Sequence, residues 1–335
     1  MATRGETGKR WAAAHLYKEE ERVAEPVAGS GRGEGPGGWL GRLRVGESRR
    51  EGRLEIVPLL LDGNGGTPGV LLTSQAMEAG VLEIVERGSG VVQELVAWNK
   101  GERPVAILEG DTLVGCKQNR VVAHSVIVAP GTSLGVPVGC MERGRWSHET
   151  SHFAAGSMKM APEVRRRTAR DVKVSARTGS GRQLDQSRLW SDVDAELAAC
   201  SVQSSTSDYN EIVERAGRDA RDRARALAPV AGQVGVVVLA EGALVGFEVT
   251  GHHALWSVVS APTLASYLMG RHRGNEVSRE GRAAPGEWLA RVQAARVSVT
   301  PGLGLGQDLE IEGPGLAGVG LALDASSVHA AVFPS

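Results

Sequence analysis

Short apolar segments separated by turn residues constrain the fold of this 335-residue chain more than any other feature. Two of them, Val105–Leu108 and Val121–Val128, flank a dense polar segment that runs from Glu109 to Arg120. A third strand candidate follows at residues 134–140. The short spacings suit hairpins, and no regular alternation of strands and helices is present to build a parallel sheet. The pattern predicts an α+β fold with a mainly antiparallel β-sheet core.

The same pattern of short segments continues along the chain, and helix signals interrupt it. Further strand candidates are Leu54–Leu61, Val81–Glu86, Val91–Trp98, Gly235–Leu239, Ala243–Val249, Val297–Val299, Asp308–Glu312, Gly318–Leu323 and Val328–Phe333. Helix candidates are Thr73–Ala79, Pro162–Lys173, Gln183–Cys200, Asp208–Leu227, His253–Gly270 and Gly286–Ala295. Residues 162–227 therefore predict a helical insert that packs on one face of the sheet. Within it Arg165–Arg167 are balanced by Glu163 and Asp171, which predicts a solvated helix face.

Composition constrains the domain organisation, the classes of partner and the cellular compartment that we expect. Residues 1–38 predict a flexible tail, because Gly29–Gly38 cannot bury enough apolar surface to order itself. Residues 39–335 are then expected to form a single α+β domain. The formal net charge of −1 gives no reason to expect nucleic acid or an anionic membrane as a partner. Three widely spaced cysteines disfavour a disulfide framework, and no apolar run approaches the roughly 18 residues of a membrane span, so we expect a cytoplasmic protein.

The polar segment carries more long hydrogen-bonding side chains than a connecting loop requires. Lys117 and Arg120 supply positive charges suited to a diphosphate, and Arg145 adds another after the third strand. Gln118 and Asn119 both donate and accept hydrogen bonds, which suits ribose hydroxyls or a base edge. These residue types together indicate a site for a nucleotide-sugar diphosphate.

Aromatic and glycine residues extend this candidate site. Trp146 offers a flat face on which an adenine can stack. Gly110 and Gly115 permit a ligand to approach the backbone closely. We expect Glu109 and Lys117–Arg120 to converge with Arg145 and Trp146 in one concave patch that binds a small molecule.

Two carboxylates are the candidate catalytic residues. Glu109 and Asp111 lie two residues apart at a strand end, so they can share a metal or divide acid and base roles. The alternative is an Asp that caps the turn and an edge Glu that pairs with Arg120. For the binding residues, the alternative is that Lys117–Arg120 is a solvated loop and that Arg145–Trp146 is a cation–π pair.

Metal and nucleophile signals are weaker. His148 and His152 have the spacing of a zinc pair only if their segment is helical, and no third ligand is evident. Cys116 would need His124 as a base to act as a nucleophile, and a packed thiol is the simpler interpretation. The sequence thus predicts no metal site and names no cofactor.

Two strings in the central block carry a family resemblance. LEGDTLVGCKQNRVV and SVIVAPGTSLGVPVGCMERGRW resemble the ARG and rhodanese-phosphatase-superfamily-associated protein domain, where ARG stands for ADP-ribosylglycohydrolase. The resemblance runs from about Leu54 to Phe333. It implies a role in NAD or ADP-ribose metabolism, and it carries over no catalytic residue.

Three functions are compatible with the residues and the resemblance. The first is a module that binds ADP-ribose or a related nucleotide-derived ligand through Glu109–Arg120, Arg145 and Trp146. The second is a hydrolase or transferase that acts on such a substrate with Glu109 or Asp111. The third is a scaffold for a partner enzyme of the ADP-ribosylglycohydrolase type.

Overall fold

The computed structural model describes residues 38–63, 68–88, 92–179, 181–270, 281–324 and 326–335. The described residues belong to one compact unit, and the predicted tail, apart from Gly38, lies outside them. Within the described part, the strands pair antiparallel except for β4 (Leu71–Leu72) with β7 (Val105–Ile107). The predicted α+β class with a mainly antiparallel sheet core is confirmed.

The largest sheet has nine strands, in the order β1-β3-β13-β14-β18-β17-β16-β15, with β2 paired to β3. Their bounds are β1 Arg44–Val45, β2 Arg49–Glu51, β3 Leu54–Leu60, β13 Gln233–Ala240, β14 Ala243–Thr250, β15 Arg296–Pro301, β16 Gln307–Gly313, β17 Leu316–Leu323 and β18 Ser326–Pro334. Glu241 and Gly242, with φ of 52° and 83°, join β13 to β14. A two-residue hairpin turn with both φ values positive matches the right-handed twist of its strands.

Two smaller sheets carry the polar segment, and here two predictions are wrong. One sheet has the order β12-β8-β9-β11-β6-β5, and the other has the order β10-β7-β4. Their remaining bounds are β5 Leu82–Glu86, β6 Glu94–Asn99, β8 Thr112–Gly115, β9 Arg120–Val122, β10 Val126–Val128, β11 Ser133–Cys140 and β12 Phe153–Ala155. The polar segment is not one loop, because Thr112–Gly115 pairs with β9 as strand β8. The predicted strand Val121–Val128 is split between the two sheets, because its apolar run serves both.

Seven α-helices lie within the described residues, together with a 3-10 helix at Gly38–Arg42. They are α1 Thr73–Glu78, α2 Pro162–Arg177, α3 Gln186–Ala199, α4 Tyr209–Arg215, α5 Arg218–Ala226, α6 His253–Met269 and α7 Pro285–Gln293. The predicted helix Asp208–Leu227 is broken at Gly217 into α4 and α5. None of the described helices combines the length and the apolar character that a membrane span needs.

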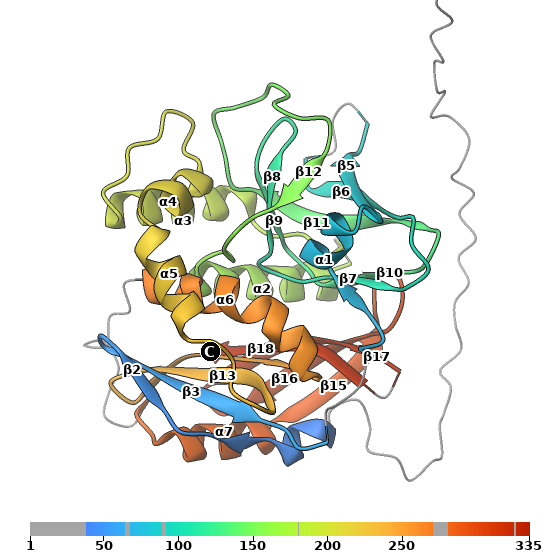
Figure 1. Ribbon diagram of the computed structural model, residues 1–335. Coiled ribbons are helices and arrows are strands. Elements are labelled where there is room, and N and C mark those ends of the chain that lie inside the picture. Colours follow the sequence, from blue (N-terminus) through green and yellow to red (C-terminus); the bar gives the residue numbers. More distant parts are fainter. Residues whose placement is uncertain (1–37, 64–67, 89–91, 180, 271–280, 325) are drawn as a thin grey trace, which may run out of the picture. The chain divides into compact units, whose positions relative to one another are not determined.

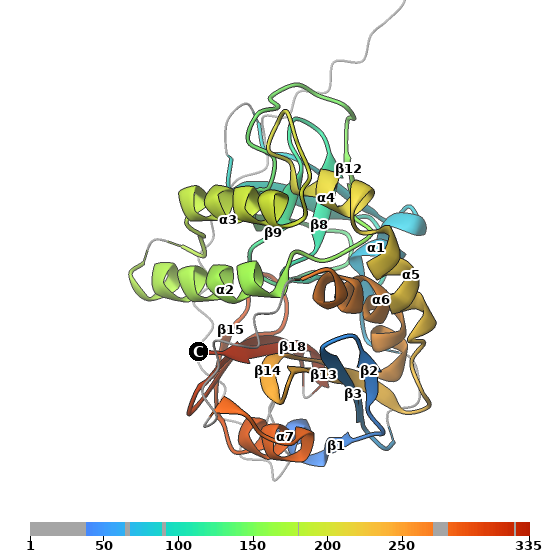
Figure 2. The same ribbon diagram turned by 90° about the vertical axis from the view of Figure 1, so that its left-hand side faces the viewer.

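The helices cover both faces of the large sheet. Helices α2 and α6 lie between this sheet and the smaller sheets, and α7 lies on the opposite face (Figures 1 and 2). Strand β13 lies at the centre of this arrangement and is buried on both faces, so its sequence is a continuous apolar run. Val236 and Val238 belong to the core on the α6 side, whereas Val237 and Leu239 belong to the core on the α7 side.

Candidate functional site

Gln118, Asn119 and Arg120, three of the four predicted ligand-binding residues of the polar segment, turn inward and hydrogen-bond to other protein groups. Gln118 Oε1 accepts a hydrogen bond from Arg120 Nη1 at 2.8 Å, and Asn119 Oδ1 accepts one from Arg145 Nη2 at 3.3 Å. Asn119 Nδ2 donates to Asp208 Oδ2 at 2.9 Å. Gln118, Asn119 and Arg120 are buried. The structure therefore brings Arg145 next to the segment, as expected, but these polar groups already have protein partners.

Arg145 and Arg120, the two arginines of this network, differ in how many of their N–H groups have hydrogen-bond partners. Arg145 Nε donates to Glu142 at 2.8 Å, and its Nη1 donates to the Cys116 carbonyl oxygen at 2.6 Å. Arg120 is fully buried and lies 3.5 Å from Glu86. Its Nε has no hydrogen-bond partner within the described part of the chain. Both guanidinium groups hold together residues of the six-stranded sheet and its adjoining turns.

Trp146 lies at the surface, and Lys117 beside it is half-buried. The indole is 52% exposed, and Lys117 Nζ lies 5.3 Å from its ring centroid. The cation over Trp146 is therefore Lys117, and the alternative of an Arg145–Trp146 pair is wrong, because Arg145 points to Glu142 instead. These contacts do not test whether Lys117 and Trp146 bind a ligand.

Asp208 gives this network a pH dependence. Burial raises its pKa to about 7, and the nearby Glu142 carboxylate acts in the same direction, against the hydrogen bond from the Asn210 backbone. In the unfolded chain an aspartate has its ordinary pKa near 3.9. Between these two values the folded protein binds the extra proton, so the stability that Asp208 contributes is fully present below about pH 4 and is lost as the pH rises toward 7.

We therefore expect Asp208→Asn to flatten the pH dependence of stability. The parent should lose up to about 1.4 kcal/mol of unfolding free energy per pH unit through Asp208 between pH 5 and 7. The asparagine keeps an N-cap oxygen for α4 but has no proton to lose in this range. Urea denaturation of both proteins at several pH values measures the difference of slopes. Equal slopes would contradict the assignment.

Glu109 and Asp111 lie apart from the predicted ligand-binding residues. Glu109 pairs with Arg165, and its Oε2 accepts from Arg165 Nε at 3.2 Å, so the expected alternative of a Glu109–Arg120 pair is wrong. Asp111 Oδ1 accepts from Lys159 Nζ at 2.7 Å, and its Oδ2 accepts from the Leu108 backbone at 3.3 Å. Asp111 thus caps its own turn, as the alternative interpretation predicted. The convergence of Glu109 with the polar segment in one patch does not occur.

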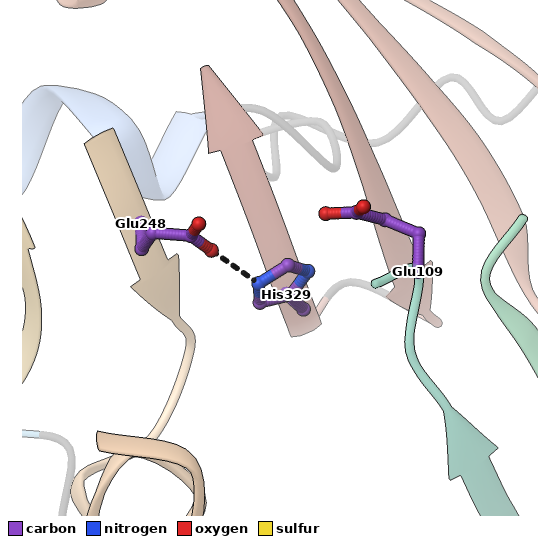
Figure 3. Close-up of side chains that lie close together, drawn as sticks. All are labelled: Glu109, Glu248 and His329. Carbon is purple, nitrogen blue, oxygen red and sulfur yellow. Dashed lines mark hydrogen bonds and ion pairs between the residues drawn. The ribbon is translucent and has the colours of Figure 1, made fainter. Parts of the chain in front are cut away.

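Glu109 belongs to a buried ionic cluster at the centre of the molecule. Arg165 on α2 bridges the carboxylates of Glu109 and Glu248, the latter on β14. His329 on β18 lies beside both carboxylates, with its Nε2 3.0 Å from Glu248 Oε2 (Figure 3). Tyr267 on α6 donates to Glu248 at 2.9 Å. The cluster ties the large sheet to α2, α6 and the turn before β8.

The charge balance of the cluster depends on Arg165. Burial would raise the pKa of Glu248, but the charges of Arg165 and His329 hold it well below its ordinary value. By donor type, Glu109, Glu248 and His329 could hold a metal ion, since their ligand atoms lie within 4.8 Å of one another. Arg165 donates to both carboxylates and so supplies the positive charge that a metal would bring. All four side chains are at most 5% exposed, so the cluster is buried in the described part of the chain.

Gly110 and Gly115 were expected to let a ligand approach the backbone, but protein side chains lie against them instead. Gly110 has a φ of 77°, and a Cβ atom there would overlap Arg165 Nε. Gly115 has a φ of 126°, and a Cβ atom there would overlap Thr150 Oγ1. Glycine at position 110 is what lets Arg165 approach the turn that carries Glu109.

A groove of about 1310 Å³ lies between α2 and the strands β16–β18. Phe333 lines it, and the Arg165 guanidinium lies 5.3 Å from the Phe333 ring, so the buried cluster lies directly behind the groove wall. None of the eight predicted site residues lines this groove. Six basic side chains do: Arg166, Arg167, Arg170, Lys173, Arg177 and Arg188.

Two of these cations have no carboxylate partner among the described residues. Arg167 pairs with Asp192 at 2.8 Å, and Arg188 pairs with Asp171 at 2.6 Å. Arg166 has only a long hydrogen bond, 3.4 Å, to the Pro334 carbonyl oxygen, and Arg170 has no recorded partner within the described part. Both side chains are exposed. The groove therefore presents two uncommitted arginines from one face of α2.

The sequence holds a signal for this surface that the charge balance of Arg165–Arg167 does not reveal. Arg166, Arg170, Lys173 and Arg177 follow the spacing of one helix face. The prediction that Arg165–Arg167 is one solvated face is wrong for Arg165, which is buried. Three consecutive residues of a helix point in different directions, so Arg165 faces the core while Arg166 and Arg167 face the groove.

Comparison with protein families gives one match. The sequence model of the ARG and Rhodanese-Phosphatase-superfamily-associated Protein domain matches residues 42–333. Comparisons with curated proteins and with solved structures returned no match.

Proposed function

This chain belongs to the ARG and Rhodanese-Phosphatase-superfamily-associated Protein domain family, and on that premise we propose that it binds ADP-ribose or a related nucleotide-derived anion. The family name associates the domain with ADP-ribosylglycohydrolases. We place the ligand in the groove between α2 and β16–β18. The observation that carries this proposal is the pair Arg166 and Arg170, which face the groove without a carboxylate partner in the described chain.

The spacing of the two arginines suits a diphosphate. Residues four apart on a helix lie about 6 Å from each other on one face. Each guanidinium can donate two parallel hydrogen bonds to the oxygens of one phosphate. One helical turn thus offers a separate fork to each phosphate of a diphosphate.

The rest of the groove can accommodate the sugar and the base. Its volume exceeds the roughly 300–1,000 Å³ of ordinary small-molecule pockets, so a nucleotide-sugar fits. Gln183 and Ser175 line it with groups that donate and accept hydrogen bonds, as ribose hydroxyls require. Val174, Leu184 and Val319 add apolar surface against which a base can lie.

We propose binding rather than catalysis as the primary activity. The candidate acid–base residues are committed elsewhere: Glu109 pairs with Arg165, and Asp111 pairs with Lys159. Neither carboxylate lines the groove. A binding module can still act together with a partner enzyme of the ADP-ribosylglycohydrolase type, which remains a compatible proposal.

The test is calorimetric titration of the purified protein with ADP-ribose. We expect Arg170→Ala to weaken binding by about 1.5–3 kcal/mol, roughly tenfold or more in Kd, because one charge-assisted hydrogen-bonding group is lost. The matched control is Arg218→Ala, which removes an exposed helical arginine that also has no partner among the described residues but lies on α5.

Three outcomes of this titration bear on the proposal. Weaker binding in Arg170→Ala but not in Arg218→Ala supports the groove. Equal affinity in both variants and the parent would reject it. Product that accumulates during the titration would show that the protein is an enzyme, which chromatography of the ligand detects.

A further inference from the structure

We infer that the C-terminal half of α2 forms a second anion subsite, which Glu310 and Glu312 occupy in the ligand-free protein. The groove then prefers an ADP-ribose-type ligand that carries a further phosphate group beyond its diphosphate. This inference rests on the proposed function, because it extends the same groove. The residues of the subsite are Lys173 and Arg177, the next two cations along the helix face that carries Arg166 and Arg170.

Strand β16 places its carboxylates opposite these cations. Side chains alternate along a strand, so Asp308, Glu310 and Glu312 share one face, while Leu309 and Ile311 are buried on the other. The acidic face meets α2 and the segment that follows it. At its far end Asp308 pairs with Arg182 at 2.9 Å.

The contacts of the subsite are ion pairs across the groove. Lys173 Nζ binds both Glu310 and Glu312. Arg177 Nη2 lies 2.9 Å from Glu310 and 3.7 Å from Glu312. Burial would lower the pKa of Lys173, but its hydrogen bonds to the two glutamates raise it above its ordinary value. Two cations thus already hold two anionic groups at one place in the groove.

These ion pairs can be exchanged for a ligand at low cost. The Arg177 and Glu312 side chains are 62% and 42% exposed, and those of Lys173 and Glu310 are 25% and 31% exposed, and ion pairs in contact with solvent contribute little net stability. A phosphate presents more acceptor oxygens and more charge than one carboxylate. An incoming phosphate can therefore displace the glutamates without disturbing the strand.

The spacing defines the ligand chemistry. Lys173 and Arg177 lie three and seven residues beyond Arg170, which is about 5–10 Å along the helix axis. A phosphate at this distance from the diphosphate can come from two sources. It can be a phosphate on the adenosine ribose, as in ADP-ribose 2′-phosphate, or it can belong to the next unit of an ADP-ribose oligomer.

The experiment compares three ligands on matched variants at about 0.15 M salt, where charges more than about 8 Å apart in solvent are largely screened. The ligands are ADP-ribose, ADP-ribose 2′-phosphate and an ADP-ribose dimer. The test variant is Glu310→Gln with Glu312→Gln, which frees both cations. The control is Glu214→Gln with Asp219→Asn, which makes the same charge change at exposed carboxylates on α4 and α5.

We expect the test variant to bind at least one of the two ligands with a further phosphate about tenfold more tightly than the parent does, and ADP-ribose less than about threefold more tightly. Adding Lys173→Ala and Arg177→Ala to the test variant should abolish the gain. The ligand that gains identifies the source of the phosphate.

Two results overturn the inference in distinguishable ways. If Arg170→Ala weakens ADP-ribose binding but the test variant gains no selectivity over the control, the second subsite is rejected and the proposed function stands. If the parent and the test variant bind none of the three ligands, both the subsite and the proposed function are rejected.

Discussion

Arg165→Met is expected to lower the free energy of unfolding by about 3–5 kcal/mol, the cost of removing one partner of a buried ion pair. Arg165 neutralises Glu109 and Glu248, both buried among α2, β14 and β18. Methionine keeps most of the volume but none of the charge, so two carboxylates would remain without their cation. Thermal and urea denaturation measure the loss.

The matched control lies one residue away. Arg166→Met removes an exposed cation from the same helix, and surface substitutions of this kind usually change stability by no more than about 0.5 kcal/mol. A large loss for Arg165→Met and almost none for Arg166→Met is the expected pair of results. If both variants unfold like the parent, the buried cluster does not stabilise the junction between α2 and the large sheet.

Arg120→Ala is expected to destabilise the protein by about 2–4 kcal/mol, because truncation leaves a cavity and removes partners from buried polar groups. Arg120 is fully buried, and it donates to Gln118 and lies 3.5 Å from Glu86. Arg120→Met should cost less than Arg120→Ala, since it fills the same space. The surface control is Arg143→Ala, whose side chain is 49% exposed.

Ligand titration separates this structural role from a binding role. We expect folded Arg120→Ala, measured below its melting temperature, to bind ADP-ribose as the parent does. If Arg120→Ala melts like the parent but binds ADP-ribose more weakly, Arg120 is a ligand-binding residue, as its sequence context predicted.

The local parts of the fold were predictable from the sequence because local patterns determine them. The hairpin of β13 and β14 follows from two apolar runs around Glu241 and Gly242, where the turn chemistry is explicit. Helix α2 follows from a proline at its first turn and from apolar residues at helical spacing. Strand β8 was missed because its four residues lie inside a segment whose polar flanks dominate the pattern.

The candidate site was less predictable because long-range partners define it. Glu109 binds Arg165, 56 residues away, and Asn119 binds Asp208, 89 residues away. A dense polar segment looks the same in sequence whether its side chains face a ligand or one another. Only the fold shows that Arg165 turns into the core while Arg166 and Arg170 face a groove.

The most direct test of the proposed function is a crystal structure of the protein with ADP-ribose. We predict electron density for the diphosphate within hydrogen-bond distance of Arg166 and Arg170, with Lys117 and Trp146 free of ligand. Density that places the diphosphate against Lys117 and the adenine on Trp146, with an empty groove beside α2, would contradict this prediction.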